Sequence, residues 1–129
     1  MKKLIALLVL AITFNFAAQA QNGMVKDGDI VTVALEQTEG EFTQKNVTLK
    51  EGSYIFTVSN NQAGKDVGFV LVPEGKDASN PKNHIKEAYV TKVVKEGSTE
   101  SSNVVALAKG TYKYFCPMNK TPQYTLVVE

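Results

Sequence analysis

The stretch Gly110–Glu129, GTYKYFCPMNKTPQYTLVVE, decides the fold. Apolar and aromatic side chains occupy every second position on both sides of a short break: Tyr112, Tyr114 and Cys116 before it, and Tyr124, Leu126 and Val128 after it. Alternation of this kind is typical of β-strands that bury one face. Pro117 and Pro122 bracket the break. We therefore predict two half-buried strands joined by a rigid loop, with Cys116 where the first strand enters the loop.

The rest of the chain divides into further short runs of strand-like sequence. These runs are residues 30–35, 42–49, 53–60, 67–72 and 104–107, and they are separated by Gly, Asn and Pro-containing turns. Residues 84–94 combine the pattern of a helical turn with that of a strand, and residues 73–83 and 96–103 are polar. Short strands at a spacing of roughly ten residues favour an all-β fold, an antiparallel β-sandwich or barrel.

The first 20 residues have the pattern of a secretory signal peptide. Lys2 and Lys3 form a charged start, Leu4 to Phe16 a mostly apolar run, and Ala18-Gln19-Ala20 a small-residue cleavage site. The apolar run is too short to remain as a membrane span, so we expect no integral membrane segment after processing. Residues 21–129 would then form one domain, located in the periplasm or secreted.

Composition excludes several classes of function. The whole chain contains no arginine and carries a formal net charge of +1, so it lacks the basic face of a nucleic-acid-binding protein. It has one histidine and no G-x-S-x-G motif, so no catalytic constellation is evident and we expect no enzyme. The single cysteine leaves three fates open: a buried thiol, a metal ligand or an intermolecular disulfide.

Three segments together resemble the cupredoxins, the small Greek-key sandwiches that include plastocyanin and amicyanin. Residues 42–60 resemble the family's strand pair, F-x-x-x-x-V-x-L followed by F-x-V-x-N. Residues 60–71, NNQAGKDVGFVL, resemble the loop and strand that carry its first histidine, and residues 110–128 resemble its last hairpin, with the entry G-T-Y-x-Y-x-C-P. The resemblance implies a Greek-key antiparallel β-sandwich. Independently, either Tyr112 or Tyr114 is suited to a tyrosine corner.

In that family a histidine from the middle of the chain and a Cys-x-x-His-x-x-Met loop hold copper. Carried onto this sequence, the four ligand positions fall on Val67, Cys116, Asn119 and Pro122. Only the cysteine is retained. A type 1 copper site needs two imidazoles as well as the thiolate, so the resemblance implies a family member in which most of the copper ligands have been replaced.

Two interpretations of this end of the sandwich follow. In the first, Val67, Cys116, Met118 and Pro122 fill the former metal site with apolar groups, and no cofactor binds. In the second, Cys116 binds copper together with Met118, Asn119 or His84. His84 lies in a polar stretch between Lys82 and Lys86, and we expect it to be exposed to solvent.

The first interpretation makes the chain an exported, monomeric, single-domain protein that lacks type 1 copper and acts as a binding or structural module. The alternative makes it a periplasmic copper-binding or electron-transfer protein. An intermolecular disulfide through Cys116 is a third possibility. The sequence identifies no protein partner, and residues 119–121, which would form the rim of the site, are polar.

Overall fold

The structure is a computed structural model and describes residues 30–129. The predicted signal peptide, residues 1–20, and its cleavage site lie outside the described residues. The described strands are β2 (Ile30–Thr38), β3 (Glu41–Phe42), β4 (Asn46–Leu49), β5 (Gly52–Asn60), β6 (Val70–Pro73), β7 (Thr99–Ser101), β8 (Val105–Leu107), β9 (Gly110–Phe115) and β10 (Tyr124–Val128). Two short 3₁₀ turns, η3 (Pro81–Asn83) and η4 (Lys86–Ala88), lie between β6 and β7.

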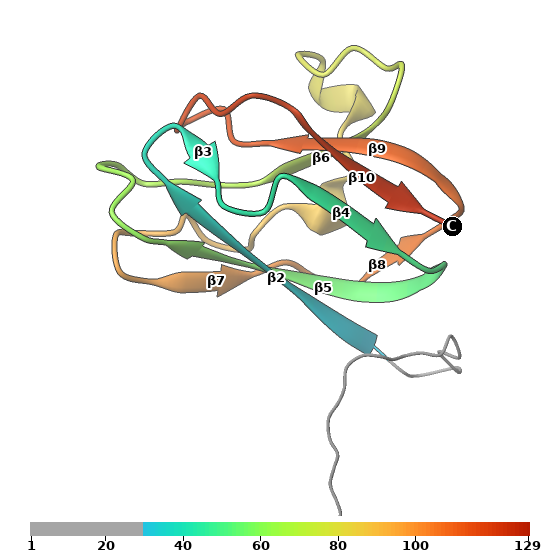
Figure 1. Cartoon of the computed structure of the whole chain (residues 1–129), viewed down its shortest axis with the longest axis horizontal. Helices are drawn as coiled ribbons and strands as arrows, with labels where there is room; N and C mark the ends of the chain where they lie inside the picture. Colours follow the sequence, from blue (N-terminus) through green and yellow to red (C-terminus); the bar gives the residue numbers. More distant parts are fainter. Residues whose placement is uncertain (1–29) are drawn as a thin grey trace, which may run out of the picture.

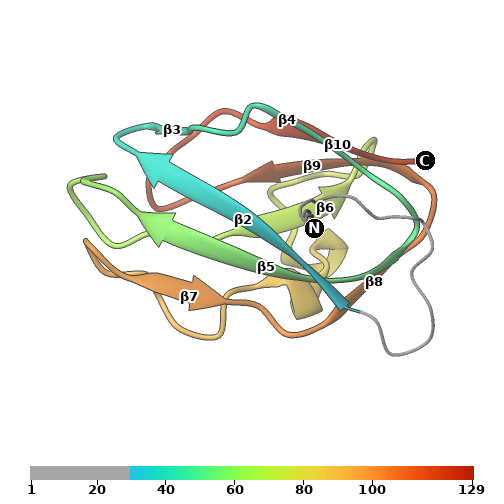
Figure 2. The ribbon, with the colours of Figure 1, turned by 60° about the horizontal axis from the view of Figure 1, so that its bottom comes forward.

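The strands form two sheets packed face to face (Figures 1 and 2). One sheet has the order β4-β10-β9-β6, and the other the order β3-β2-β5-β7, with β8 also pairing with β5. The predicted sandwich is confirmed, but the sheets are mixed, because β2 pairs with β5 and β4 pairs with β10 in parallel. Long connections, rather than tight hairpins, therefore join these paired strands.

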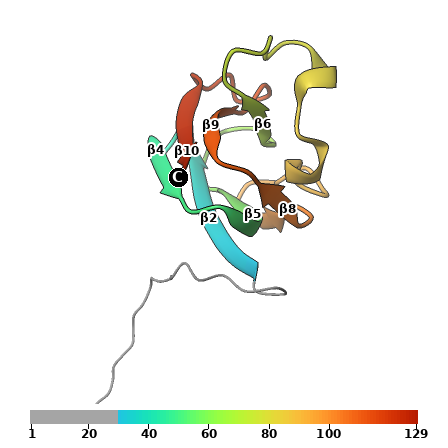
Figure 3. The same ribbon diagram turned by 90° about the vertical axis from the view of Figure 1, so that its right-hand side faces the viewer.

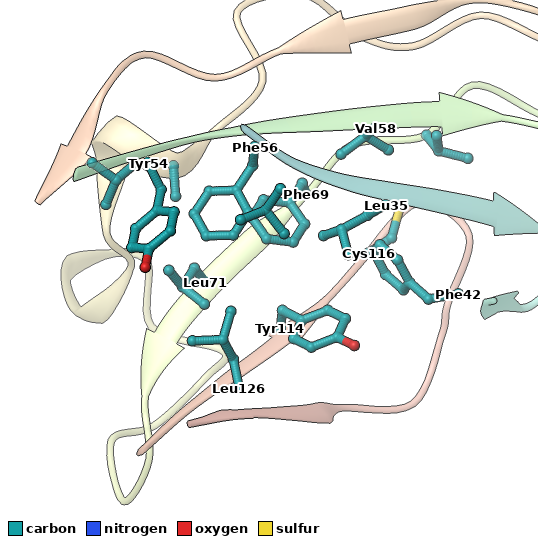
Figure 4. Close-up of a cluster of buried hydrophobic side chains, with 14 of the residues drawn as sticks. Leu35, Phe42, Tyr54, Phe56, Val58, Phe69, Leu71, Tyr114, Cys116 and Leu126 are labelled. Carbon is teal, nitrogen blue, oxygen red and sulfur yellow. The ribbon is translucent and has the colours of Figure 1, made fainter. Parts of the chain in front are cut away.

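The inward faces of the two sheets form one core, shown in Figure 4. The predicted alternation holds: Tyr54, Phe56 and Val58 of β5 and Tyr114 of β9 are buried. The Phe56 and Phe69 rings lie 5.1 Å apart between centroids, so aromatic packing crosses from one sheet to the other. This apolar core holds β9 and β10, the two strands on either side of the final loop.

Several boundaries differ from the predictions. The predicted strand 42–49 is split into β3 and β4, and β7 occupies part of the polar segment 96–103. Residues 84–94 contain η4 followed by isolated bridges at Val90 and Val94. β2 continues to Thr38, through residues predicted as a turn, because Gln37 occupies an inward position and is fully buried.

Two tyrosine hydroxyls form hydrogen bonds that hold connections between strands against the sheets. Tyr112 donates to the carbonyl oxygen of Ala108 at 2.7 Å, and Tyr54 donates to that of Lys50 at 2.6 Å. Both bonds return four residues along the chain, which is the geometry of a tyrosine corner. The predicted corner is confirmed at Tyr112, and the corner at Tyr54 is a second one that the sequence did not indicate.

Candidate functional site

The loop after β9 turns back on itself immediately after Cys116. Residues 117–120 form a turn, and Lys120 closes it with a positive φ of 55°. The Cys116 main chain is bonded to Thr121 twice: its N–H donates to Thr121 Oγ1 at 2.9 Å, and its carbonyl accepts from Thr121 N–H at 3.2 Å. This turn directs Asn119 toward the protein interior rather than toward solvent.

The Cys116 thiol is enclosed at the end of the core. It is fully buried, and Figure 4 shows its sulfur beside Leu35 and Phe42. Its Sγ accepts two main-chain N–H groups, from Gly68 and from Asn119, each at 3.3 Å. The cysteine is therefore both an apolar filler and a hydrogen-bond acceptor that ties the segment just before β6 to the final loop.

Asn119, which we predicted to stand at the second histidine position of a copper site, has all of its side-chain hydrogen-bonding groups used within the protein. Its Nδ2 donates to Gln37 Oε1 at 3.0 Å and to the Thr38 carbonyl at 2.8 Å. Its Oδ1 accepts from Gly40 N–H at 2.9 Å. Asn119 is 4 % exposed, so these bonds satisfy an amide that would be costly to bury unpaired.

Gln37 extends this network to β6. Its Nε2 donates to the carbonyl oxygen of Gly68 at 2.7 Å while its Oε1 accepts from Asn119. We call Gln37, Gly40, Gly68, Cys116 and Asn119 the closure network. Sequence reasoning missed Gln37; the available signal was the two-residue spacing that places it on the same strand face as Val33 and Leu35.

Val67, which we predicted to stand at the first histidine position of a copper site, is fully buried in the core. Its main chain forms two bonds with Val94, of 3.0 Å and 2.9 Å. Asn60 holds the same corner, since its Nδ2 donates to the carbonyls of Val94 at 3.0 Å and Lys65 at 2.8 Å. Val67 therefore presents a buried aliphatic side chain on a backbone fixed by hydrogen bonds.

The predicted apolar filling is only partly right. Val67 and Cys116 are buried as expected, but Pro122 is exposed and Met118 is 39 % exposed. A Cβ atom on Gly68 would lie 2.8 Å from the Met118 methyl, so the end of Met118 covers Gly68 from its side-chain direction. Cys116 instead meets the N–H of Gly68. Amide hydrogen bonds, and not Pro122, complete this end of the sandwich.

His84 is not the exposed histidine that the sequence predicted. Its Nδ1 lies 2.7 Å from Tyr89 Oη and its Nε2 lies 2.7 Å from the Ala78 carbonyl oxygen. Because that carbonyl can only accept, Nε2 carries the proton and Nδ1 accepts from Tyr89 in the neutral ring. Its ring also packs edge-on against Phe115, at 6.2 Å between centroids.

This placement separates His84 from the cysteine. Phe115 and Cys116 are consecutive residues, and their side chains point to opposite faces of the sheet. His84 contacts Phe115 on the outer face, whereas Cys116 lies in the core. Figure 3 shows the segment after β6 lying outside that strand. The only histidine of the chain therefore stands across the sheet from the only cysteine.

The residues at this end do not fit a type 1 copper ion. Such a site needs a thiolate and two imidazoles. Here Val67 has no donor atom, and the amide of Asn119 already has protein partners. His84 uses both ring nitrogens elsewhere. Within residues 30–129, no three His, Cys, Asp or Glu side chains are grouped as a metal site would require.

The structure is a mixed β-sandwich with a buried cysteine between its last two strands. This arrangement agrees with the resemblance to the cupredoxins that the sequence indicated. Residues 4–128 match the cupredoxin-like domain, so the chain belongs to that family. No curated protein sequence matches the chain. Among residues 30–129, no helix has the length and apolarity that crossing a membrane demands.

Solved structures show the same fold. Auracyanin A, described as a blue copper protein of the bacterium Chloroflexus aurantiacus, has a TM-score of 0.64 at 22 % identity, over 78 % of this chain and 99 % of its own. Reduced auracyanin from Roseiflexus castenholzii has a TM-score of 0.60 at 20 % identity, over 76 % and 96 % of the two chains. An amicyanin variant has a TM-score of 0.51 at 18 % identity, over 83 % and 88 %.

Proposed function

We propose that this chain is an exported, monomeric cupredoxin-like protein that lacks type 1 copper and serves as a non-catalytic binding module. The observation that carries the proposal is the state of Asn119. Its amide is nearly fully buried and bonded to Gln37, Thr38 and Gly40. Binding a metal at Cys116 would require breaking these bonds, and Val67 offers no donor in exchange.

The first test is copper binding by the mature protein. Cu(II) added to residues 21–129 should give no intense visible thiolate-to-copper absorption, and dialysis should remove the added metal. A strong absorption band, with copper retained in an amount equal to that of the protein, would refute the proposal. That result would support the alternative, a periplasmic copper-binding or electron-transfer protein. In that case Cys116→Ser should abolish the band, because the thiolate is the ligand that produces it.

The second test is export. The proposal places the mature N-terminus near Gln21, following cleavage after Ala20. Mass spectrometry of the product from the periplasm or culture medium should show this start. A product that keeps Lys2 and Lys3 and stays in the cytoplasm would refute the assigned location without bearing on the copper test.

A further inference from the structure

A cleft of about 390 Å³ lies beside the start of β6 and shares Gly68 with the closure network. It is lined by three segments: residues 68–70, residues 89–93, and Pro117 with Met118. We call it the β6 cleft. Main-chain bonds close both of its ends, Val67 with Val94 at one and Ile85 N–H with the Leu71 carbonyl at the other. Between these two bonds, residues 86–93 do not pair with the edge of the sheet, so that edge is open.

The floor of the β6 cleft is the main chain of Phe69. Residues alternate along a strand edge: Gly68 bonds toward β9, to Cys116 Sγ, and Glu74 N–H bonds to Thr111, whereas Val67 and Leu71 bond outward. The N–H and C=O of Phe69 therefore point outward, into the cleft. Neither group has a hydrogen-bond partner among residues 30–129. Phe69 is 2 % exposed as a whole residue, so its ring lies in the core and only a small part of its main chain is accessible at the cleft floor.

The walls of the β6 cleft are mainly apolar, with one charge. Val93 is 47 % exposed and Met118 39 %, which makes them two of the five large hydrophobic residues exposed in the described chain. Lys92 is the only charged residue among those lining the cleft. Within residues 30–129 it forms no salt bridge, unlike Lys95, which lies 4.0 Å from Asp66.

These features together specify a chemical class of ligand. A free N–H and C=O on one extended residue match the C=O and N–H of another extended residue. The apolar walls match an aliphatic side chain, and the ammonium of Lys92 matches a carboxylate. The volume is at the small end of the range for ligand pockets, roughly 300 to 1,000 Å³, so one or two residues fill it.

We propose that the β6 cleft binds an apolar amino-acid residue with a free carboxylate, acylated on its nitrogen. Such a residue occurs at the C-terminus of a peptide and in a free N-acyl amino acid. This inference rests on the proposed function as a binding module, and it names what the module binds. The ligand residue pairs with the Phe69 main chain, places its side chain between Val93 and Met118, and directs its carboxylate to Lys92.

Titration of the ¹⁵N-labelled mature protein with N-acetyl-leucine, followed by amide NMR spectra, tests the proposal. We expect saturable shifts confined to residues 68–70, residues 89–93 and Met118, with an affinity in the millimolar range. N-acetyl-glycine, which lacks the side chain, and N-acetyl-leucine amide, which lacks the charge, should each bind about tenfold more weakly or worse. No shifts with N-acetyl-leucine, or equal binding of the three probes, would overturn the proposal.

Matched variants separate the cleft from the general surface. Lys92→Glu and Val93→Asp should each weaken binding of N-acetyl-leucine by about tenfold or more. Lys76→Glu and Val104→Asp make the same changes at exposed positions outside the cleft and should leave binding unchanged. Loss of binding in the controls alone, or unchanged binding in the cleft variants, would contradict the assignment.

Two further probes distinguish the sources of the ligand. A pentapeptide ending in leucine should bind more tightly than N-acetyl-leucine if a polypeptide C-terminus is the ligand, and amidating its terminus should remove the gain. Equal affinities would assign the cleft to free N-acyl amino acids. Failure of every probe would refute the cleft proposal alone, because the copper test measures absorption from the Cys116 thiolate, which does not line the cleft.

Discussion

The side chains of Asn119 and Gln37 are hydrogen-bonded at 3.0 Å although they lie 82 positions apart in the chain. One belongs to the loop between the last two strands and the other to the strand that opens the described structure. Both are buried, and each also bonds to a third segment, Asn119 to Gly40 and Gln37 to Gly68. The pair therefore connects β2 of one sheet to the loop between β9 and β10 of the other.

Asn119→Ala should destabilise the fold by about 2 to 4 kcal/mol. It removes three hydrogen bonds and leaves Gly40 N–H and Gln37 Oε1 without their partner. Chemical denaturation measures the change in the free energy of unfolding. Asn103→Ala is the control, since that side chain is exposed, and it should cost less than about 0.5 kcal/mol. Equal effects of the two substitutions would contradict the role of the closure network.

The destabilising effects of substituting Gln37 and Asn119 should not be additive. In a double-mutant cycle with Gln37→Ala and Asn119→Ala, the second substitution should cost about 1 to 2 kcal/mol less when the first is already present, because the partner group is gone. Gln37→Ala with Asn103→Ala supplies a distant pair that should be additive to within about 0.5 kcal/mol. A coupling energy near zero for the first pair would show that the observed contact contributes nothing.

The Cys116 thiol should react slowly with thiol reagents in the native protein. It is fully buried, so modification requires local or global opening. Labelling should accelerate in parallel with unfolding as denaturant is raised, and a non-reducing gel should show a monomer. Rapid labelling in native buffer, or a dimer that collapses with reductant, would support the intermolecular disulfide instead.

His84→Ala should loosen the connection between β6 and β7. The substitution removes the contacts of both ring nitrogens and the packing on Phe115. Hydrogen exchange should rise at Ile85, whose N–H bonds to Leu71 across this connection, and the fold should lose about 1 to 2 kcal/mol. Amides of β5 and β10, which do not touch the ring, should exchange in step with global unfolding in both proteins.

The stability of the fold should fall at high pH because of Tyr114. Burial raises the pKa of Tyr114 to about 12, helped by the nearby Tyr124 hydroxyl. The unfolded chain loses that proton near its usual pKa of about 10. The stabilisation is complete below about pH 10 and is lost as pH rises toward 12, on the order of 2 kcal/mol. Tyrosinate absorbance should show a late phase that Tyr114→Phe removes.

The sequence predicted the sandwich because its signals are local. Strict alternation in residues 53–60 and 110–116 determines which side chains enter the core, and both faces are confirmed. The fates of Val67 and Cys116 were also predictable, since an apolar group beside buried strands has few alternatives. The replacement of metal ligands could be read from residue types alone.

The closure network could not be predicted in the same way. Asn119 enters the interior because Lys120 takes a positive φ and Thr121 bonds back to Cys116, and a short sequence pattern does not encode that turn. Its partner Gln37 lies in a segment rich in turn-forming residues, which concealed the end of β2. The hydrogen bonding of His84 likewise depends on a turn of the chain that brings the Ala78 carbonyl oxygen to its ring. No residue spacing in the sequence predicts that contact.

The saturated amide of Asn119 makes a type 1 copper site hard to build at this end of the sandwich. Asn119→His alone would leave Oε1 of the fully buried Gln37 without its donor, and Val67→His alone would place a polar ring among fully buried neighbours. Each single step toward copper would lower stability before any affinity for the ion was gained. A type 1 copper site at this end would therefore need several residues to change together, and the hydrogen bonds of Asn119 oppose each single change.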